Sequence, residues 1–211
     1  IAGVSGNGQQ ELMKALSGET LIGDAVAITL MGTPAACMNA AERRALGLCF
    51  VPEERLGRGA VPEMSLADNA LLTGYVTNYR QDMVRSGLIN RPSIRAFAQK
   101  VIERFGVKCG GDQSLAGSLS GGNLQKFIVG RETSLAPKVM VLAQPTWGVD
   151  VGAAMLIRQA IIDLRDQGVA VLVVSEELDE LFMMCDRIAV MAEGRLTPAV
   201  PVASTSVDQI G

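Results

Sequence analysis

The chain has 211 residues, of which 48% are hydrophobic and 19% charged, enough for one substantial domain with a buried core. It contains no histidine, which excludes catalytic triads, proton relays and metal sites that depend on an imidazole. A formal net charge of −3 gives no reason to expect a nucleic acid as partner. The 4 cysteines are scattered along the chain, which excludes a CxxC redox or zinc pair.

Short β-branched runs alternate with longer helical patterns, which is typical of a parallel sheet flanked by helices. In chain order, helices are predicted over 11–16, 66–73, 92–105 and 152–167. Strands are predicted over 25–30, 48–51, 139–142, 169–174 and 188–191. The clearest helix ends before Gly168, at the place where a left-handed residue is usually glycine.

The strand pattern stops between about residues 62 and 118, where two helical patterns dominate. This interruption predicts a helical subdomain, over about 62–120, inserted into a domain that spans 1–195. Residues 196–211 are rich in Pro, Ser, Thr and Val without periodicity. They are interpreted as an extended tail or part of a small terminal element.

A glycine-rich turn, Gly3-Val-Ser-Gly-Asn-Gly-Gln-Gln10, leads into the first predicted helix. Its spacing is that of the phosphate loop GxxxxGKS/T, in which backbone N–H groups wrap a phosphate at a helix N-terminus. Gln9 stands where the lysine belongs, and Gln10 stands where the Mg²⁺-binding hydroxyl belongs. Losing the charge-assisted hydrogen bond costs about 1.5–3 kcal/mol, or roughly ten- to more than a hundredfold in affinity.

The turn by itself has two other readings. One is a glycine-rich strand-to-helix turn that binds no ligand. The other is a dinucleotide-binding turn, but the glycine order is GxxGxG rather than GxGxxG, and Asp24 precedes the next predicted strand instead of ending it.

The run Leu119-Ser-Gly-Gly-Asn-Leu-Gln-Lys126 is more specific. Two glycines after a serine open a helical pattern, so a hydroxyl and free N–H groups stand at a positive helix end, where an anion can bind. Downstream follow Val139-Met-Val-Leu-Ala-Gln-Pro-Thr-Trp-Gly-Val-Asp150 and Val171-Leu-Val-Val-Ser-Glu-Glu177.

With these motifs in this order, the chain resembles the ATP-binding cassette of ABC transporters over nearly its whole length. The run Phe50-Val-Pro-Glu-Glu-Arg-Leu-Gly-Arg-Gly59 and the Ala-Gln-Pro-Thr run narrow the resemblance. They are similar to the second, C-terminal cassette of the duplicated ATP-binding protein of simple-sugar and nucleoside importers. The resemblance implies an α/β fold, a RecA-like P-loop NTPase parallel sheet with an inserted α-helical subdomain. It also implies that the cassette's N-terminal strands are missing, and with them the aromatic residue that stacks on adenine.

The chain departs from the family at the positions that perform hydrolysis. The family's Asp-Glu pair, which holds Mg²⁺ and orients the attacking water, is replaced by Ala143 and Gln144. Glu176 stands at the position of the switch histidine, and Glu53 at that of the loop glutamine. Together with the changes at Gln9 and Gln10, these departures predict that no catalytic group is intact and that this half does not hydrolyse ATP efficiently alone.

The resemblance also implies two sets of binding residues. In this family two cassettes pack head to tail, and each ATP lies between one phosphate loop and the other cassette's signature. The chain's own nucleotide site would comprise Gly3, Ser5, Gly6, Asn7, Gly8, Gln9, Gln10 and Glu53. The signature offered to the partner would comprise Leu119, Ser120, Gly121, Gly122 and Gln125, with Asp150 in the D-loop.

The implied ligand is ATP, weakly bound or regulatory in the chain's own site, and Mg²⁺ would enter only with ATP in the composite site. The implied partners are the intact N-terminal cassette of the same protein, transmembrane permease subunits and, indirectly, a solute-binding protein. The implied location is peripheral, on the cytoplasmic face of the plasma (inner) membrane.

Several alternatives stay open at this point. A self-sufficient ABC-type ATPase and a soluble ABC protein outside transport are the rival functions. Arg55 and Arg58 lie in the loop that faces the membrane subunits in the family, so they are either docking residues or solvated loop arginines. Trp147 either contributes to the nucleotide interface or packs against the fold.

Overall fold

The computed structural model describes residues 1–77 and 80–210. Among these residues, the core is a parallel sheet of three strands in which β6 lies between β3 and β7. Val139 of β6 pairs with Leu48 on one side and Ala170 on the other. The bounds are β3 (Leu48–Val51), β6 (Val139–Ala143) and β7 (Ala170–Val174). The three corresponding sequence predictions are confirmed to within one residue at each end.

The side chains of these strands alternate between two faces, and each face has its own buried cluster. Leu48 and Phe50 of β3 belong to the cluster shared with α1 (Gln9–Ser17). Cys49 and Val51 belong to the larger cluster on the opposite face. Burial on both faces explains why the strands read as continuous apolar runs rather than as alternating patterns.

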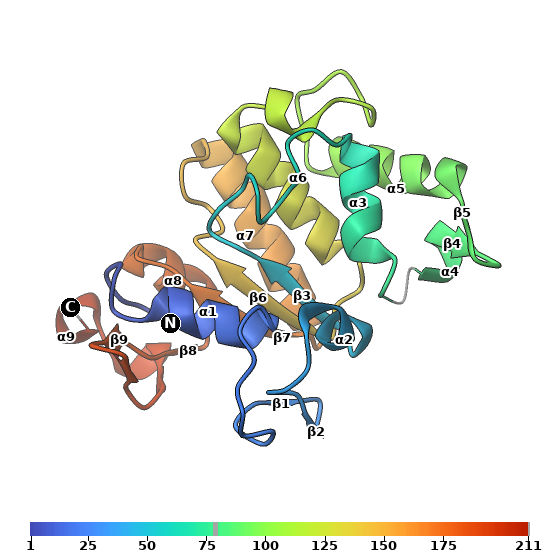
Figure 1. The fold of residues 1–211 in the computed structure, drawn as a ribbon. Helices are drawn as coiled ribbons and strands as arrows, with labels where there is room; N and C mark the ends of the chain where they lie inside the picture. The colour runs from blue at the N-terminus through green and yellow to red at the C-terminus, as the bar shows by residue number, and fades with distance from the viewer. Residues whose placement is uncertain (78–79, 211) are drawn as a thin grey trace.

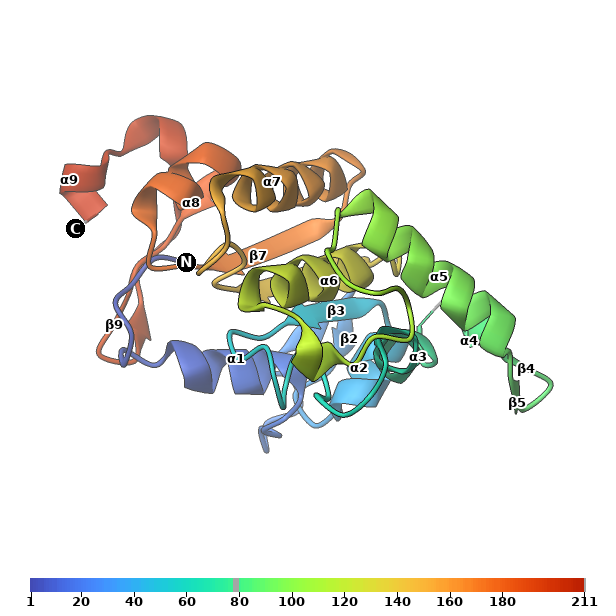
Figure 2. The same cartoon turned by 90° about the horizontal axis from the view of Figure 1, so that it is seen from above.

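Helices cover both faces of the sheet (Figures 1 and 2). On one side lie α6 (Gly121–Thr133) and α7 (Val151–Asp166), and α8 (Leu178–Met184) packs beside α7. On the other side lie α1 and α2 (Ala40–Ala45). The helix predicted over 152–167 is confirmed as α7, shifted by one residue.

The helical segment between β3 and β6 contains α3 (Leu66–Gly74), α4 (Arg80–Met83), α5 (Arg91–Arg104) and the short 3-10 helix η1 (Ala116–Ser118). It also contains a hairpin of β4 (Val84–Arg85) and β5 (Leu88–Ile89), which the sequence does not predict. Leu88 is 75% exposed and Ile89 50%, so the hairpin buries no alternating apolar face that a sequence pattern could show.

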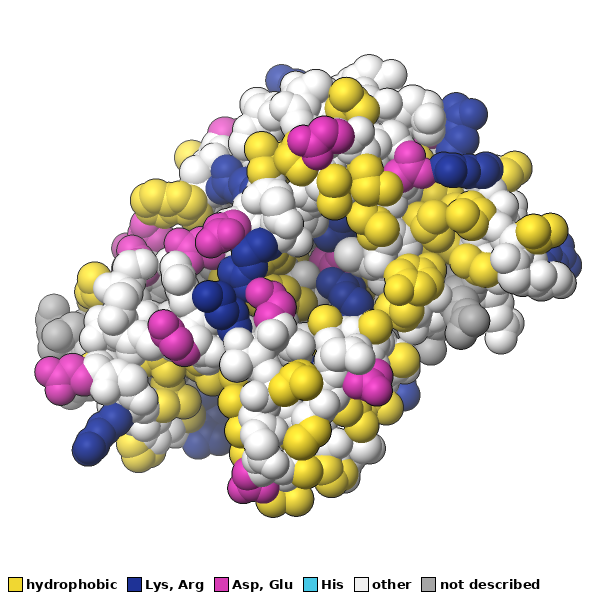
Figure 3. All heavy atoms as spheres, viewed as in Figure 1, with side chains coloured by type: hydrophobic (Ala, Val, Ile, Leu, Met, Phe, Trp, Pro, Cys, Tyr) yellow, Lys and Arg dark blue, Asp and Glu magenta, His cyan; other side chains and the backbone are white. Residues whose placement is uncertain are grey.

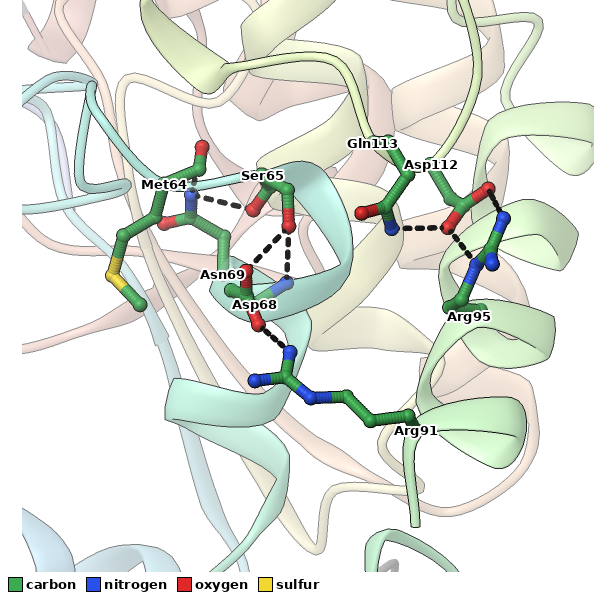
Figure 4. Close-up of polar contacts among 8 residues, drawn as sticks. All are labelled: Met64, Ser65, Asp68, Asn69, Arg91, Arg95, Asp112 and Gln113. Carbon is green, nitrogen blue, oxygen red and sulfur yellow. Dashed lines mark hydrogen bonds and ion pairs between the residues drawn. The ribbon is translucent and has the colours of Figure 1, made fainter. Parts of the chain in front are cut away.

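Polar contacts tie α5 to the beginning and to the end of this helical segment (Figure 4). Ser65 is the N-cap of α3, and its Oγ accepts the N–H of Asp68 over 3.0 Å. Arg91 at the start of α5 forms an ion pair with Asp68. Arg95 forms a second ion pair, of 2.8 Å, with Asp112 in the segment before η1.

A buried ion cluster anchors α6 to its surroundings. The Glu132 side chain is 0% exposed and lies 2.7 Å from Nη1 of Arg44 and 2.9 Å from Nε of Arg131. Arg131 also donates to the carbonyl oxygens of Gly59 and Asn69. The cluster therefore fixes α2, the loop after β3 and α3 to one turn of α6.

The prediction of a strand over 25–30 is wrong for most of its length. Only Thr29–Leu30 forms a strand, β1, and it pairs antiparallel with β2 (Thr33–Pro34). The residues before it form a turn, because Asp24 accepts the N–H of Val26 through its carboxylate and that of Ala27 through its carbonyl oxygen.

The predicted strand over 188–191 is divided in the structure. Its place is taken by β8 (Arg187–Ile188) and β9 (Met191–Ala192). Residues 196–210 turn back on the domain, because β11 (Val200–Pro201) pairs antiparallel with β8. The remaining elements are β10 (Arg195–Leu196), paired with β9, the 3-10 helix η2 (Val202–Ser204) and α9 (Val207–Ile210).

Candidate functional site

The glycine-rich turn lies at the carboxyl end of the sheet, where Ala2 bridges to Ser175 directly after β7. Gly6 and Gly8 have φ angles of 89° and 106°, which glycine adopts without strain. Gly8 is the N-cap of α1 and provides no side chain to cap the helix. The turn therefore presents backbone N–H groups at a helix N-terminus, as the phosphate-loop pattern predicts.

Two of these donors are already engaged by side chains of the chain itself. The N–H of Ser5 donates to Oε1 of Glu176 over 2.8 Å, and the N–H of Asn7 donates to Oε1 of Gln9 over 3.0 Å. Nε2 of Gln9 in turn donates to the carbonyl oxygen of Val4 over 2.8 Å. A carboxylate and an amide thus occupy donors that a phosphate would need.

Glu176 is held in this position by the segment that follows β7. Its N–H donates to Oε1 of Gln144 over 3.3 Å. The preceding Ser175 is 1% exposed and donates through its hydroxyl to Glu180, which also accepts from the Thr146 hydroxyl. The carboxylate therefore reaches the glycine turn from a fixed backbone.

The space enclosed beside the turn is small and acidic. Its volume is about 30 Å³, enough for water but far below the roughly 300–1,000 Å³ of an ordinary ligand pocket. Glu53 and Glu176 both line it, and the single basic lining residue, Arg58, is paired with Glu19 over 2.7 Å. This charge balance opposes a phosphate instead of attracting one.

The end of β6 carries no carboxylate for a metal ion. Ala143 is 4% exposed, and Gln144 follows it with a φ of 47° in the left-handed region. Its N–H donates to the carbonyl oxygen of Val174, which fixes the amide beside β7. Among residues 1–77 and 80–210, no cluster of three or more Asp, Glu, Cys or His is arranged to bind a metal ion.

The signature residues form a different, open surface at the start of α6. Ser120 is the N-cap of the helix, and its Oγ accepts the N–H and the side-chain amide of Asn123. Ser120 and Gly121 are exposed, and Gly122 is half-buried. Leu119 packs against the main core cluster and anchors the segment. This arrangement leaves the glycine pair accessible at a positive helix end.

Gln125, which the resemblance assigns to the signature, lies beneath this open surface in the present structure. It is 1% exposed, its Nε2 donates to the carbonyl oxygen of Pro145 over 2.9 Å, and its Oε1 accepts Nε of Arg55 over 3.1 Å. Both ends of the amide are used inside the chain. This side of α6 faces the fold because the loop after β3, through Arg55, and the turn after β6, through Pro145, contact it.

The turn after β6 leads into α7. Asp150 is the N-cap of that helix, and its carboxylate accepts the N–H of Ala153 over 2.9 Å. This hydrogen bond lowers the pKa of Asp150 below its ordinary value. Trp147 is 59% exposed, so its ring does not serve as a packing residue of this chain.

Arg55 and Arg58, in the loop after β3, both bind other residues of the chain, and their partners differ. Arg58 pairs with Glu19, whereas Arg55 turns toward α6 and donates to Gln125 and to the carbonyl oxygen of Trp147. Sequence reasoning missed both of these contacts and that of Glu176, because each one joins residues far apart in the chain.

Comparison with solved structures identifies the fold. A dimeric ATP-binding cassette in a post-hydrolysis state bound to ADP and Pi superimposes with a TM-score of 0.78, at 16% identity, over 96% of this chain and 84% of that one. A nucleotide-free cassette from an ABC transporter gives a TM-score of 0.70 at 21% identity, over 95% of this chain and 79% of that one. The chain therefore has the fold of an ATP-binding cassette, and the predicted RecA-like parallel sheet with a helical subdomain is confirmed.

In sequence, the chain is similar to curated ATP-binding proteins of importers. It is 38% identical, over its full length, to the nucleoside import ATP-binding protein NupA of Lactococcus lactis subsp. cremoris. It is 39% identical over its full length to the glucose import ATP-binding protein of Haloferax volcanii, and 35% identical over 93% to a ribose import ATP-binding protein of Lactococcus lactis subsp. cremoris. These alignments cover 41%, 38% and 39% of the relatives. No family model matches the chain.

Proposed function

We propose that the chain is the degenerate nucleotide-binding half of an ABC importer for simple sugars or nucleosides. In this role it lends its signature surface to the ATP site of an intact cassette and transmits nucleotide binding to membrane subunits. The observation that carries the proposal is the contrast between its two anion-binding helix ends. The α6 end is open, whereas the α1 end is closed by the chain's own side chains.

The open end supports donation to a partner. Ser120 and Gly121 are exposed at the N-terminus of a thirteen-residue helix, where N–H groups and the helix dipole favour a phosphate. The turn at Gly148 and Val149 lies against Gly122, and Trp147 in the same turn is 59% exposed. An apolar surface beside a positive helix end is suited to a second cassette that carries a nucleotide.

The closed end supports a weak or regulatory role for the chain's own site. Phosphate binding there must displace Glu176 from Ser5 and Gln9 from Asn7. It must also overcome the repulsion of the two carboxylates that line the cavity. Mg²⁺ finds no carboxylate at Ala143, so it would enter only with ATP in the composite site.

A groove on the face drawn in Figure 3 supports contact with membrane subunits. It has a volume of about 360 Å³ and lies where α2 and α3 meet the loop after β3. Its charged lining residues are paired within the chain, because Arg58 pairs with Glu19 across the groove, and Arg44 and Arg131 both pair with the buried Glu132. No helix in the described part of the chain is long and apolar enough to span a bilayer. We propose that permease subunits dock here on the cytoplasmic face of the inner membrane. A solute-binding protein would then act on this chain only indirectly, through those subunits.

The test is ATP turnover by an intact cassette that retains the phosphate-loop lysine, measured with and without this chain in excess. Ser120→Asp and Ser120→Asn form a matched pair, because both side chains cap a helix well and differ in one charge. We expect wild-type chain to stimulate turnover. Ser120→Asn should retain much of this stimulation, and Ser120→Asp should abolish it, because a carboxylate at the helix end repels the γ-phosphate.

Circular dichroism of both variants is the control, and both should retain the helix content of wild type. The absence of stimulation by folded wild-type chain, or equal stimulation by the Asp and Asn variants, would contradict signature donation.

A further inference from the structure

The loop over 52–60, which follows β3, connects the two helix ends just described. Its beginning lines the small cavity through Glu53. Its end is fixed by the buried Arg131, which donates to the carbonyl oxygen of Gly59 over 2.8 Å. Inside the loop, the N–H of Ala60 donates to the carbonyl oxygen of Arg55 over 2.7 Å. These hydrogen bonds fix the conformation of the loop.

The side chain of Arg55 extends from this loop to two further segments. Its Nε donates to Oε1 of Gln125 on α6 over 3.1 Å, and its Nη2 donates to the carbonyl oxygen of Trp147. Gln125 also joins α6 to the turn after β6, because its Nε2 donates to the carbonyl oxygen of Pro145 over 2.9 Å. One guanidinium thus joins the loop, the signature helix and the turn that leads to α7.

The glycines on either side of the guanidinium leave room for it. A Cβ atom at Gly121 would lie 2.8 Å from Nη1 of Arg55, closer than real Cβ atoms approach a neighbour. A Cβ atom at Gly148 would lie 3.3 Å from Nη2. The guanidinium therefore lies directly against the backbone of the first signature glycine.

The chemistry of these contacts requires arginine. Burial lowers the pKa of Arg55, and within the described residues its guanidinium makes no ion pair. Its identified partners are neutral oxygens at fixed directions, which match the rigid planar fork of a guanidinium. A lysine has one flexible ammonium group and cannot hold both the amide oxygen and the carbonyl oxygen in the same geometry.

We propose that Arg55 is the positioning residue of the donor surface. It sets Gly121 and the turn over 144–150 at a fixed spacing, and it ties both to the loop that borders the chain's own cavity. This inference rests on the proposed function, because the spacing matters when the partner's nucleotide is bound between the signature and that turn. Arg55 acts through these segments and is not itself assigned a contact with nucleotide.

Two measurements on Arg55→Ala and Arg55→Lys test the proposal, with Glu54→Ala as the matched control in the same loop. The first is amide hydrogen exchange of the isolated chain. In Arg55→Ala, we expect exchange to accelerate by about tenfold or more at Leu124, Trp147 and Val149, whose N–H groups are hydrogen-bonded in these segments, because the segments open locally once the contact is lost. Exchange in β6 should remain as in wild type.

The second measurement is stimulation of the intact cassette's ATP turnover, analysed as kcat and KM. A misplaced donor surface should lower kcat by about tenfold or more, while KM for ATP changes by less than about twofold. Arg55→Lys should recover little of this loss. Glu54→Ala should match wild type in both measurements.

Three outcomes decide the matter. Unchanged exchange in both segments of Arg55→Ala overturns the proposal, as does full activity of Arg55→Lys in stimulation. Accelerated exchange without any stimulation by wild-type chain supports the positioning of the two segments and contradicts signature donation, so the two failures are distinguishable. If Arg55→Ala does not fold, Arg55→Lys provides the same exchange comparison.

Discussion

At the scale of single residues, the glycine-rich turn differs from an ordinary phosphate loop because side chains of the chain itself bind its backbone N–H groups. Gln9 has the position of a lysine, but its amide is bonded within its own turn. Glu176 has the position of a histidine, but its carboxylate accepts a backbone N–H of the same turn. The loop is closed by these two contacts as well as by the loss of its positive charge.

Removal of the Glu176 carboxylate should therefore open the loop. In Glu176→Ala, we expect the affinity for a fluorescent ATP analogue with Mg²⁺ to rise by about tenfold or more, because a hydrogen bond to a charged group is released. Fluorescence titration of the isolated chain measures this change. Glu53→Ala is the control, since Glu53 lines the same cavity but takes neither loop N–H. An equal gain in both variants would show that only net charge matters.

The sequence predicts the candidate sites unevenly, for a physical reason. Ser120 and the two glycines after it form a local pattern, so the sequence places them at a helix start, as observed. The contacts of Arg55 and Glu176 depend on long side chains that reach segments about 70 and 171 residues away. No spacing in the sequence encodes such contacts.

At the scale of elements, burial decides which predictions succeed. The strands of the central sheet and α7 are confirmed, because each buries a repeating apolar pattern. The segment over 25–28 is apolar as well, but Val26 is 66% exposed, and Asp24 closes a turn there. The hairpin of β4 and β5 escapes prediction for the converse reason, because it forms without burying an apolar face.

The element-scale prediction concerns Glu132, which holds α6 to Arg44 and Arg131. Glu132→Gln should lower the free energy of unfolding by about 3–5 kcal/mol near neutral pH, since it leaves two buried guanidinium groups without their counter-charge. Urea denaturation measures the difference. Glu103→Gln on the exposed side of α5 is the control, expected to lie within about 0.5 kcal/mol of wild type.

The same contact predicts a pH dependence. Burial raises the pKa of Glu132, but the guanidinium groups of Arg44 and Arg131 outweigh it, and the pKa lies below its ordinary value. A depressed pKa contributes stability above the unfolded-state pKa of about 4.3, and this contribution is lost as the pH falls through the folded-state pKa. The stability gap between wild type and Glu132→Gln should thus be constant near neutrality and shrink in acid. A gap independent of pH would contradict this assignment.

At the scale of the whole molecule, the C-terminal segment folds back on the domain. β11 pairs with β8, Val202 donates its N–H to the carbonyl oxygen of Asp186, and the side chains of Val202 and Ile210 pack against the main core cluster. We therefore expect these residues to contribute to the free energy of unfolding of the domain that contains the signature.

A pair of adjacent substitutions tests this contribution. Val202→Asp should lower the free energy of unfolding by roughly 1–3 kcal/mol, because it places a charge against the core cluster. Ala203→Asp, at an exposed position, should stay within about 0.5 kcal/mol of wild type. Urea midpoints of the two variants provide the comparison, and equal midpoints would show that the segment is energetically independent of the domain.

The contact between Glu176 and the glycine turn has one further consequence. A carboxylate attached to the same chain behaves as a ligand that never diffuses away, and such tethered ligands compete at effective concentrations of the order of millimolar. A nucleotide in solution must outcompete this internal ligand before it meets an empty loop. We therefore expect the loop's occupancy to respond weakly to changes in nucleotide concentration.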